Sequence, residues 1–419
     1  MMFSKKNSTK DITDYNIKIN IVNGIAFAIS LNLVKPYFAK FLERLGGNDY
    51  YFALLNSLPA LLSVFAFLPG AILIESAKSK TKVTSKFLIS QKLIYLLIAI
   101  IPFLGNVNKP FLFVLLIGLM NFPGSIAIMG YQSSIGDIFN SSNLGRAMSL
   151  RNRYSDVFRL IFSLLAGQAL SIIPKTPEDT IKLYQLFFVL AFVFGCIEFI
   201  ALLKFKNKKD KEEIHKEKYL NVFVSTVKDI PKQKKLISFI ICSLMFHFGW
   251  QMGWPLFSIY SIKYLHADEF WLSIITIVSG ISSIFSSTLW AKFADKKGNS
   301  FALALATLGM SITPILYVFS KSLIHLAIFN VIVGVSVAGT ILILFNLLLE
   351  VTPTKNRTIY IAIYNIMISI SATIAPLVSV WLKDLTSIYF TLILVAILRL
   401  SGSIAFFIRN IRLKKDLLD

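Results

Sequence analysis

One long apolar run of the sequence carries polar and aromatic side chains at the spacing of a helix face. His247, Trp250, Gln251, Trp254 and Ser258 lie at positions i, i+3, i+4, i+7 and i+11, which places them in a single stripe of an α-helix. Aromatic rings beside a hydrogen-bonding amide suit a partly apolar or ring-bearing solute. Hydrogen bonding between helices would give the same pattern, and for this stripe we favour contact with a solute.

A second apolar run contains two opposite charges. Asp156 and Arg159 are i, i+3 neighbours, and Ser163 continues their face. A charge within hydrocarbon costs on the order of 2.5–3.5 kcal/mol on insertion scales and marks function by default. The two residues can form a purely structural ion pair. Alternatively, Asp156 exchanges protons while Arg159 holds an anionic group, and this makes Asp156 our candidate for proton coupling.

Other apolar runs carry uncharged polar side chains on one face. Polar groups in hydrocarbon turn toward protein or toward a water-filled cavity. Each one alone is more readily explained by a hydrogen bond between helices than by solute contact. The candidates are Asn23, Ser30, Asn121, Ser125, Gln132 and Asn330. A further charge, Arg399, lies near the middle of the last apolar run, and the sequence offers no partner for it.

The elements that carry these residues are membrane-spanning helices. The chain has 419 residues, 55% of them hydrophobic, and the apolar residues form runs that approach or exceed the ~20 residues needed to cross a bilayer. Such runs must be helical, because lipid offers no partner for an open backbone amide. We predict an all-α polytopic membrane protein with twelve spans: Ile19–Phe38, Tyr50–Leu73, Phe87–Leu104, Phe111–Ile135, Ala147–Ile173, Leu183–Leu203, Leu236–Tyr260, Phe270–Trp290, Phe301–Phe319, Leu323–Leu349, Ile359–Leu382 and Ile388–Ile408.

The distribution of Lys and Arg residues along the chain predicts its orientation in the membrane. With the N-terminus inside, the cytoplasmic segments hold 31 of the 43 Lys and Arg residues and the outer loops hold 8. By the positive-inside rule, both termini are cytoplasmic and the protein lies in the inner (cytoplasmic) membrane. The net charge of +21 is therefore explained by basic residues in the cytoplasmic segments of a membrane protein, and we expect no nucleic-acid partner.

The longest polar segment divides the spans into two groups of six. We predict an N-terminal six-helix bundle at 1–203, a cytoplasmic linker at 204–235 and a C-terminal six-helix bundle at 236–419. The linker holds 11 basic and 5 acidic residues, so we expect it to lie on anionic lipid headgroups.

The loop after the eighth span resembles a signature of the major facilitator superfamily. The matching residues are Ala291, Asp295, Lys296 and Gly298. The resemblance implies two pseudo-symmetric six-helix halves that alternate access to a central cavity. It also implies that the first, fourth, seventh and tenth spans line this cavity, which is where most of the polar candidates above lie.

The resemblance also implies a gate on the cytoplasmic side. An acid ends the fourth and tenth spans and an arginine precedes the next, as Asp137 with Arg146 and Glu350 with Arg357. In the family such charges form a latch, to which Asp295, Lys296 and Gly298 would contribute. Semi-exposed pairs each add up to ~1 kcal/mol, which can bias a balanced equilibrium.

The sequence contains no motif for enzyme chemistry. It has no Gly-x-x-x-x-Gly-Lys-Ser/Thr phosphate loop and no metal-binding spacing among its His and Cys residues. We therefore expect a monomeric transporter of a small solute, without cofactor or metal, driven by a proton or sodium gradient. Proton-linked export is slightly favoured over uptake by symport. A polytopic membrane enzyme or a receptor without flux is the alternative of another class.

Overall fold

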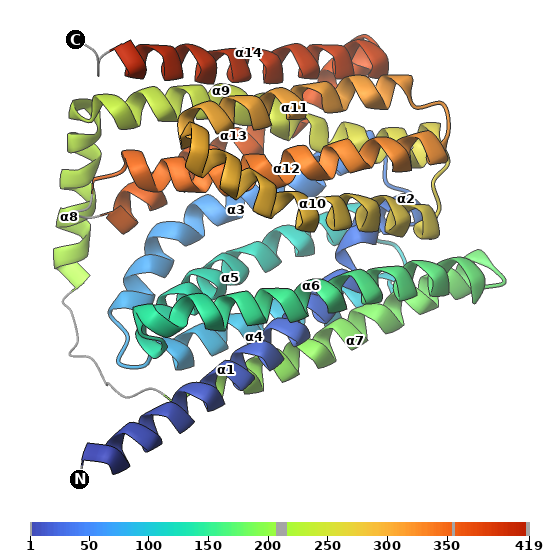
Figure 1. Cartoon of the computed structure of the whole chain (residues 1–419). Coiled ribbons are helices and arrows are strands. Elements are labelled where there is room, and N and C mark those ends of the chain that lie inside the picture. The colour runs from blue at the N-terminus through green and yellow to red at the C-terminus, as the bar shows by residue number, and fades with distance from the viewer. Residues whose placement is uncertain (1, 207–215, 354–356, 416–419) are drawn as a thin grey trace. The chain divides into compact units, whose positions relative to one another are not determined.

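Every regular element in the described part of the chain is helical. The computed structural model describes residues 2–206, 216–353 and 357–415 (Figure 1). The helices are α1 (Met2–Asn32), α2 (Phe38–Arg44), α3 (Asp49–Glu75), α4 (Lys80–Ile100), α5 (Lys109–Ile138), α6 (Ser141–Ile172), α7 (Pro177–Leu203), α8 (Lys216–Asp229), α9 (Lys234–Ile259), α10 (Glu269–Lys297), α11 (Asn299–Phe319), α12 (Leu323–Val351), α13 (Arg357–Leu385) and α14 (Ile388–Lys415).

Among the residues that the structure describes, twelve segments are long and apolar enough to cross a membrane, and each coincides with a predicted span. The first, Ile12–Arg44, joins α1 and α2 through a short 3₁₀ turn at Lys35–Tyr37. The seventh, Lys234–Tyr264, ends in a turn of π-helix at Tyr260–Tyr264. The predicted all-α membrane fold is confirmed.

Local sequence signals set the ends of several spans. Side-chain oxygens of Asn108, Thr176, Asp268 and Ser322 accept a hydrogen bond from a backbone N–H in the first turn of α5, α7, α10 and α12, which satisfies a donor that the helix leaves open. Between α10 and α11, Gly298 has φ of 86°. Only glycine adopts this conformation without strain, which explains why a glycine stands at this reversal of the chain.

The chain forms two compact units that share several contacts between helices. The first unit holds the chain up to Gly46 together with Phe65–Lys218, and the second holds Gly47–Val64 and Tyr219–Asp419. In the first unit, α1 packs on α6 and α7, and α4 packs on α5 and α7. In the second unit, α9 packs on α13 and α14, and α11 packs on α12 and α14. Each of these contacts in the second unit joins spans that lie six places further along the chain than the spans of the matching contact in the first unit. The two halves are therefore structural repeats.

The helix α3 is divided between the units, and a charged cluster accounts for the position of its first turns. Asp49, at the start of α3, lies 2.5 Å from Lys263 Nζ and also pairs with Lys383. Lys263 lies in the π-helical turn after α9, and Lys383 lies near the end of α13. Two cations on one partly buried carboxylate thus tie the first turns of α3 to the second unit.

The polar segment between the repeats contains the amphipathic helix α8, which runs crosswise to α9 in Figure 1. Its last residue, Asp229, accepts hydrogen bonds from Tyr360 and Gln233, which connects it to α13 and to the start of α9. Residues 207–215 of the predicted linker lie outside the described residues.

Candidate functional site

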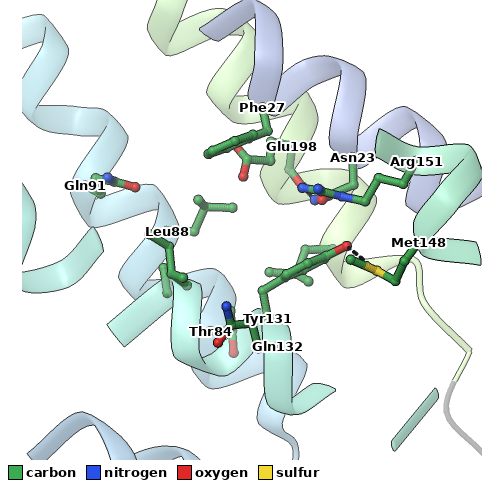
Figure 2. Close-up of a pocket in the computed structure, with 13 residues that line it drawn as sticks. Asn23, Phe27, Thr84, Leu88, Gln91, Tyr131, Gln132, Met148, Arg151 and Glu198 are labelled. Carbon is green, nitrogen blue, oxygen red and sulfur yellow. Dashed lines mark hydrogen bonds between the residues drawn. The ribbon is translucent and has the colours of Figure 1, made fainter. Parts of the chain in front are cut away.

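The first unit contains a pocket of about 260 Å³ among α1, α4, α5, α6 and α7. Figure 2 shows side chains from all five helices converging on it. Its lining combines apolar walls with a small set of polar groups, a composition typical of small-molecule sites. The lining residues are Asn23, Phe27, Thr84, Leu88, Gln91, Ala127, Ile128, Tyr131, Gln132, Met148, Arg151, Glu198 and Leu202.

A guanidinium group is held over two aromatic rings of the pocket. Arg151 Cζ lies 4.7 Å from the centroid of the Tyr131 ring and 5.7 Å from that of Phe27. Gly24 makes room for it, because a Cβ there would lie 2.5 Å from Arg151 Cγ. Arg151 Nε is buried and has no hydrogen-bond partner among the described residues. The pocket therefore holds a positive charge that an anionic group of a solute can neutralise.

Amide and hydroxyl groups surround this charge. The Tyr131 hydroxyl donates to Asn20 Oδ1 at 2.6 Å. Asn23 donates through Nδ2 to the Glu198 carbonyl oxygen at 3.2 Å. Its own Oδ1 is buried and unpartnered within the described ranges. A buried acceptor without a donor costs about 1–3 kcal/mol, so a donor group on a solute, or a water molecule, would stabilise this site.

A buried ion pair adjoins the pocket. Lys92 Nζ on α4 lies 2.9 Å from Glu198 Oε2 on α7, and the two side chains are only 2% and 8% exposed. Lys92 also donates to Ser30 Oγ at 3.2 Å, and Ser30 donates to the Ala191 carbonyl oxygen. Gly195 admits the lysine, because a Cβ there would lie 2.6 Å from Lys92 Cγ.

The two charges of this pair stabilise each other. Removing the charge of one partner leaves the other buried without compensation, which costs about 3–5 kcal/mol. Glu198 also lines the pocket, whereas Lys92 lies behind it, 5.6 Å from the centroid of the Phe27 ring.

The structure places some of the predicted polar residues of the first unit at the pocket and others away from it. Asn23 and Gln132 line the pocket, and Ser30 contacts Lys92 behind it. Asn121 bonds the Ile117 carbonyl of its own helix, and Ser125 is half-buried on the same helix. Neither of these two is among the residues that line the pocket.

Asp156 and Arg159 form the ion pair that was one of the two predicted alternatives. Arg159 Nη2 lies 3.2 Å from Asp156 Oδ1, and both side chains are about one-third exposed or more. Arg159 Nε is nevertheless buried and unpartnered within the described ranges. The proton-coupling role of Asp156 and the anion-binding role of Arg159 stay predictions.

In the second unit, the predicted stripe on α9 is tied to α13. His247 Nδ1 lies 2.8 Å from the Ser243 carbonyl oxygen, and Ser243 Oγ lies 2.6 Å from the Tyr364 hydroxyl. Gln251 is buried; it donates to the Ile368 carbonyl oxygen at 3.2 Å and accepts from Ser371 at 2.6 Å.

The rings of Trp250 and Trp254 are half-buried and pack edge to face. Asn330, from the tenth span, is buried and bonds the Leu326 carbonyl of its own helix. Gln251 thus makes the contact between helices that we weighed against solute binding, whereas His247 and Asn330 bond carbonyl groups of their own helices. Their role toward a solute stays a prediction.

Three of the predicted gating residues, Asp137, Arg146 and Glu350, contact residues other than their predicted partners. Lys80 lies 3.3 Å from Asp137 and 2.8 Å from Glu75. Arg146 is 66% exposed, with Asp14 at 3.9 Å.

In the second repeat, Glu350 accepts a hydrogen bond from Asn299 at 3.0 Å, and Arg357 is half-buried. Asp295 and Lys296 are exposed beside Gly298. The gating roles of all these residues stay predictions.

Sequence reasoning missed Arg151, Tyr131 and Lys92, and it also missed Glu198, which the structure buries against Lys92. Arg151 was counted with the cytoplasmic charges of the fifth span. A usable signal was present, because Arg151, Ser155, Arg159 and Ser163 are spaced four residues apart and share one face of α6. Each has a buried side-chain atom without a partner among the described residues.

Within the described ranges, no three His, Cys, Asp or Glu side chains gather as a metal site. The pocket is lined by charged groups, amides and aromatic rings, a set that can hold a small polar solute.

Comparison with known proteins identifies the architecture. The sequence model of the family described as Major Facilitator Superfamily matches residues 239–417. No curated protein sequence matches the chain significantly.

Solved structures match nearly the whole chain. A mutant of the nucleoside transporter NupG aligns with a TM-score of 0.71 at 12% identity, covering 94% of this chain and 99% of that one. A bacterial homologue of the human lysosomal transporter Spinster, inward-facing and unoccupied, gives 0.69 at 10% identity, with 97% and 98% covered. A POT family transporter in complex with a thioalcohol-conjugated peptide gives 0.68 at 11% identity, with 94% and 96% covered.

Proposed function

From the premise that this chain belongs to the Major Facilitator Superfamily, we propose that it is a secondary transporter of a small organic anion. Two observations support transport over a membrane enzyme or a receptor without flux. The family sequence model matches most of the second repeat, and transporter structures share the fold over nearly the whole chain. Alternating access of the two repeats would then expose the solute site to each side of the membrane in turn.

The position of Arg151 is the main observation that supports an organic anion as the substrate. Its guanidinium lies against the rings of Phe27 and Tyr131 in the pocket, and no carboxylate pairs with it in the described part of the chain. Guanidinium groups favour planar, bidentate recognition of carboxylate or phosphate. Aromatic walls favour an apolar or ring-bearing body. A small carboxylate with a planar or apolar body satisfies both.

We assign proton coupling to Glu198 and Lys92. When Glu198 takes up a proton, Lys92 becomes an uncompensated cation next to the pocket, and an anionic solute binds more tightly. By linkage, the bound anion also raises the affinity of Glu198 for the proton. Proton and anion would then move together, which favours symport and uptake over the export that the sequence slightly favoured. Asp156, with its partner Arg159, is the competing site for coupling.

A flux experiment tests the proposal and its direction. Purified protein is screened by thermal shift against aromatic and aliphatic carboxylates. Nucleosides and short peptides are included because structures of a nucleoside transporter and of a peptide-bound transporter share the fold at 12% and 11% identity. Stabilising solutes are then assayed in proteoliposomes. Under symport, an acidic exterior drives accumulation; accumulation with an acidic interior instead would establish antiport. No saturable flux of any stabilising solute would refute transport of organic anions.

The topological predictions stay proposals with a simple test. We propose that the chain is a monomer in the cytoplasmic membrane, with both termini inside and bundles at 1–203 and 236–419 joined by the linker 204–235. A phosphatase fused to the C-terminus should be inactive and a fluorescent protein should be bright. The opposite pattern would reverse the orientation.

A further inference from the structure

The second unit has a groove between the start of α9 and the end of α14, far along the chain from the residues of the solute pocket. Its volume is about 520 Å³, and the two helices that form it lie side by side (Figure 1). They approach closely where Gly402 meets α9, because a Cβ there would lie 2.6 Å from Phe246 Cα. The lining residues are Lys234, Lys235, Ser238, Ile241, Cys242, Met245, Ala405, Ile408, Arg409 and Arg412.

One end of the groove is strongly cationic. Lys234, Lys235 and Arg412 are exposed there, and Arg409 is only 4% exposed. Among the described residues that line the groove, none is acidic. Four positive charges without a lining carboxylate repel one another, so an anion bound among them would relieve this repulsion.

The buried arginine is oriented by the protein and keeps an unused donor. Arg409 Nη2 donates to the Lys235 carbonyl oxygen at 3.3 Å, and Nη1 donates to Ser300 Oγ at 3.4 Å. Both bonds are long, and Nε is buried without a partner among the described residues. A phosphate oxygen is the acceptor that such a guanidinium prefers.

The other wall of the groove is apolar and belongs to membrane-spanning segments. Ile241 is 54% exposed, and Met245 and Ile408 are each 45% exposed. All three lie within candidate spans, Lys234–Tyr264 and Ile388–Arg412. From Lys234 to Met245 the helix rises about 16 Å at 1.5 Å per residue, roughly half of the hydrocarbon thickness. The charges are therefore at headgroup level and the apolar wall is at the level of one leaflet.

We propose that this groove binds an anionic glycerophospholipid. The headgroup phosphate lies among Lys234, Lys235, Arg409 and Arg412, and an acyl chain follows Ile241 and Met245. Basic pockets between spanning helices bind anionic headgroups in this way. The apolar wall distinguishes a lipid from free phosphate, which would use only the cationic end. The site is independent of the solute and of the direction of transport.

The test is native mass spectrometry of the detergent-purified full chain. The wild type is titrated with phosphatidylglycerol and, in parallel, with phosphatidylcholine of the same acyl chains. We expect a preferred single phosphatidylglycerol adduct. In the triple variant K234Q/K235Q/R412Q, which changes only exposed side chains, its affinity should fall about tenfold or more. The matched control K82Q/K86Q/K292Q also removes three exposed charges but leaves the groove intact, and should bind as the wild type does.

A second arm separates lipid from free anion. Inorganic phosphate in large excess should leave the phosphatidylglycerol adduct in place, whereas displacement of the lipid by phosphate would reduce the groove to a simple anion site. Equal binding of the two lipids, or wild-type affinity in the groove variant, would overturn the proposal. A matching thermal-shift profile for both triple variants verifies that each is folded.

Discussion

Arg399 Nη1 donates a hydrogen bond of 3.0 Å to the carbonyl oxygen of Met310, four residues before Pro314. Proline has no amide hydrogen, so this carbonyl cannot receive its usual helical bond from residue 314. The fully buried guanidinium supplies the missing donor. Its other nitrogens donate to the carbonyl oxygens of Gly249 and Trp250 on α9. Arg399 therefore joins α14 to α9 and α11 through backbone groups, which explains why the sequence offered no acidic partner.

We expect Arg399→Met to lower the stability of the purified protein by about 1–3 kcal/mol, because the Met310 carbonyl becomes a buried acceptor without a donor. Pro314→Ala restores an amide at position 314. The cost of Arg399→Met should therefore be smaller in the Pro314→Ala background. Thermal unfolding in detergent, measured for the four members of this double-mutant cycle, checks the coupling. Additive effects would mean that the bond to Met310 contributes nothing.

Arg151→Gln should reduce solute transport. Loss of a charge-assisted contact of about 1.5–3 kcal/mol corresponds to a fall of about 10- to 100-fold in kcat/KM. Arg151→Lys should recover only part of the activity, because lysine keeps the charge but loses the planar stacking on Tyr131. Arg153→Gln is the matched control, since Arg153 is exposed on the same helix. Equal flux in Arg151→Gln and Arg153→Gln would remove Arg151 from the site.

Glu198→Gln should abolish accumulation driven by a pH gradient while solute exchange continues, because the variant cannot take up the coupling proton. Lys92 is then left buried without its partner, at a cost of about 3–5 kcal/mol. The double variant Lys92→Gln with Glu198→Gln removes both charges and should recover stability without recovering coupling. Asp156→Asn is assayed in parallel. Normal coupling in Glu198→Gln, with its loss in Asp156→Asn, would assign coupling to Asp156.

Gln251→Ala and Trp254→Ala distinguish solute contact from helix packing on α9. If the stripe contacts the solute, flux should fall several-fold in both variants while membrane abundance is kept. Gln251→Ala should also lower the melting temperature, because it removes the bonds to Ile368 and Ser371. A lower melting temperature with unchanged flux would establish the structural role, and unchanged flux in both variants would exclude the stripe from the site.

The end of α8 should respond to acid. Hydrogen bonds from the Tyr360 hydroxyl and then from Gln233 lower the pKa of Asp229 below its ordinary value. A carboxylate with a lowered pKa stabilises the folded state above its unfolded pKa of about 4, and this contribution is lost as the pH falls through the folded pKa. Hydrogen exchange in α8 should therefore rise below about pH 4 in the wild type. Asp229→Asn should remove this acid dependence, and identical pH profiles would contradict the role of Asp229.

The sequence by itself determined the membrane fold. Twelve apolar runs require twelve helices, because an open backbone amide has no partner in lipid. Six spans on each side of a long polar segment indicated the repeat, and the residues around Gly298 indicated the family. Orientation came from the Lys and Arg distribution and awaits its test. All of these features depend on composition along short stretches of chain, so periodicity and charge can report them.

Only the tertiary structure decided which polar residues meet. Lys92 and Glu198 are separated by more than a hundred residues, and α4 must pack on α7 before they form a pair. Arg151 was counted with the membrane-edge charges because hydropathy cannot tell a helix face turned to a pocket from one turned to water. Arg399 donates hydrogen bonds to backbone carbonyl groups. Every residue has such a group, so no residue type in the sequence indicates the partner. Contacts between helices depend on packing and depth, and a linear pattern of residue types does not contain that information.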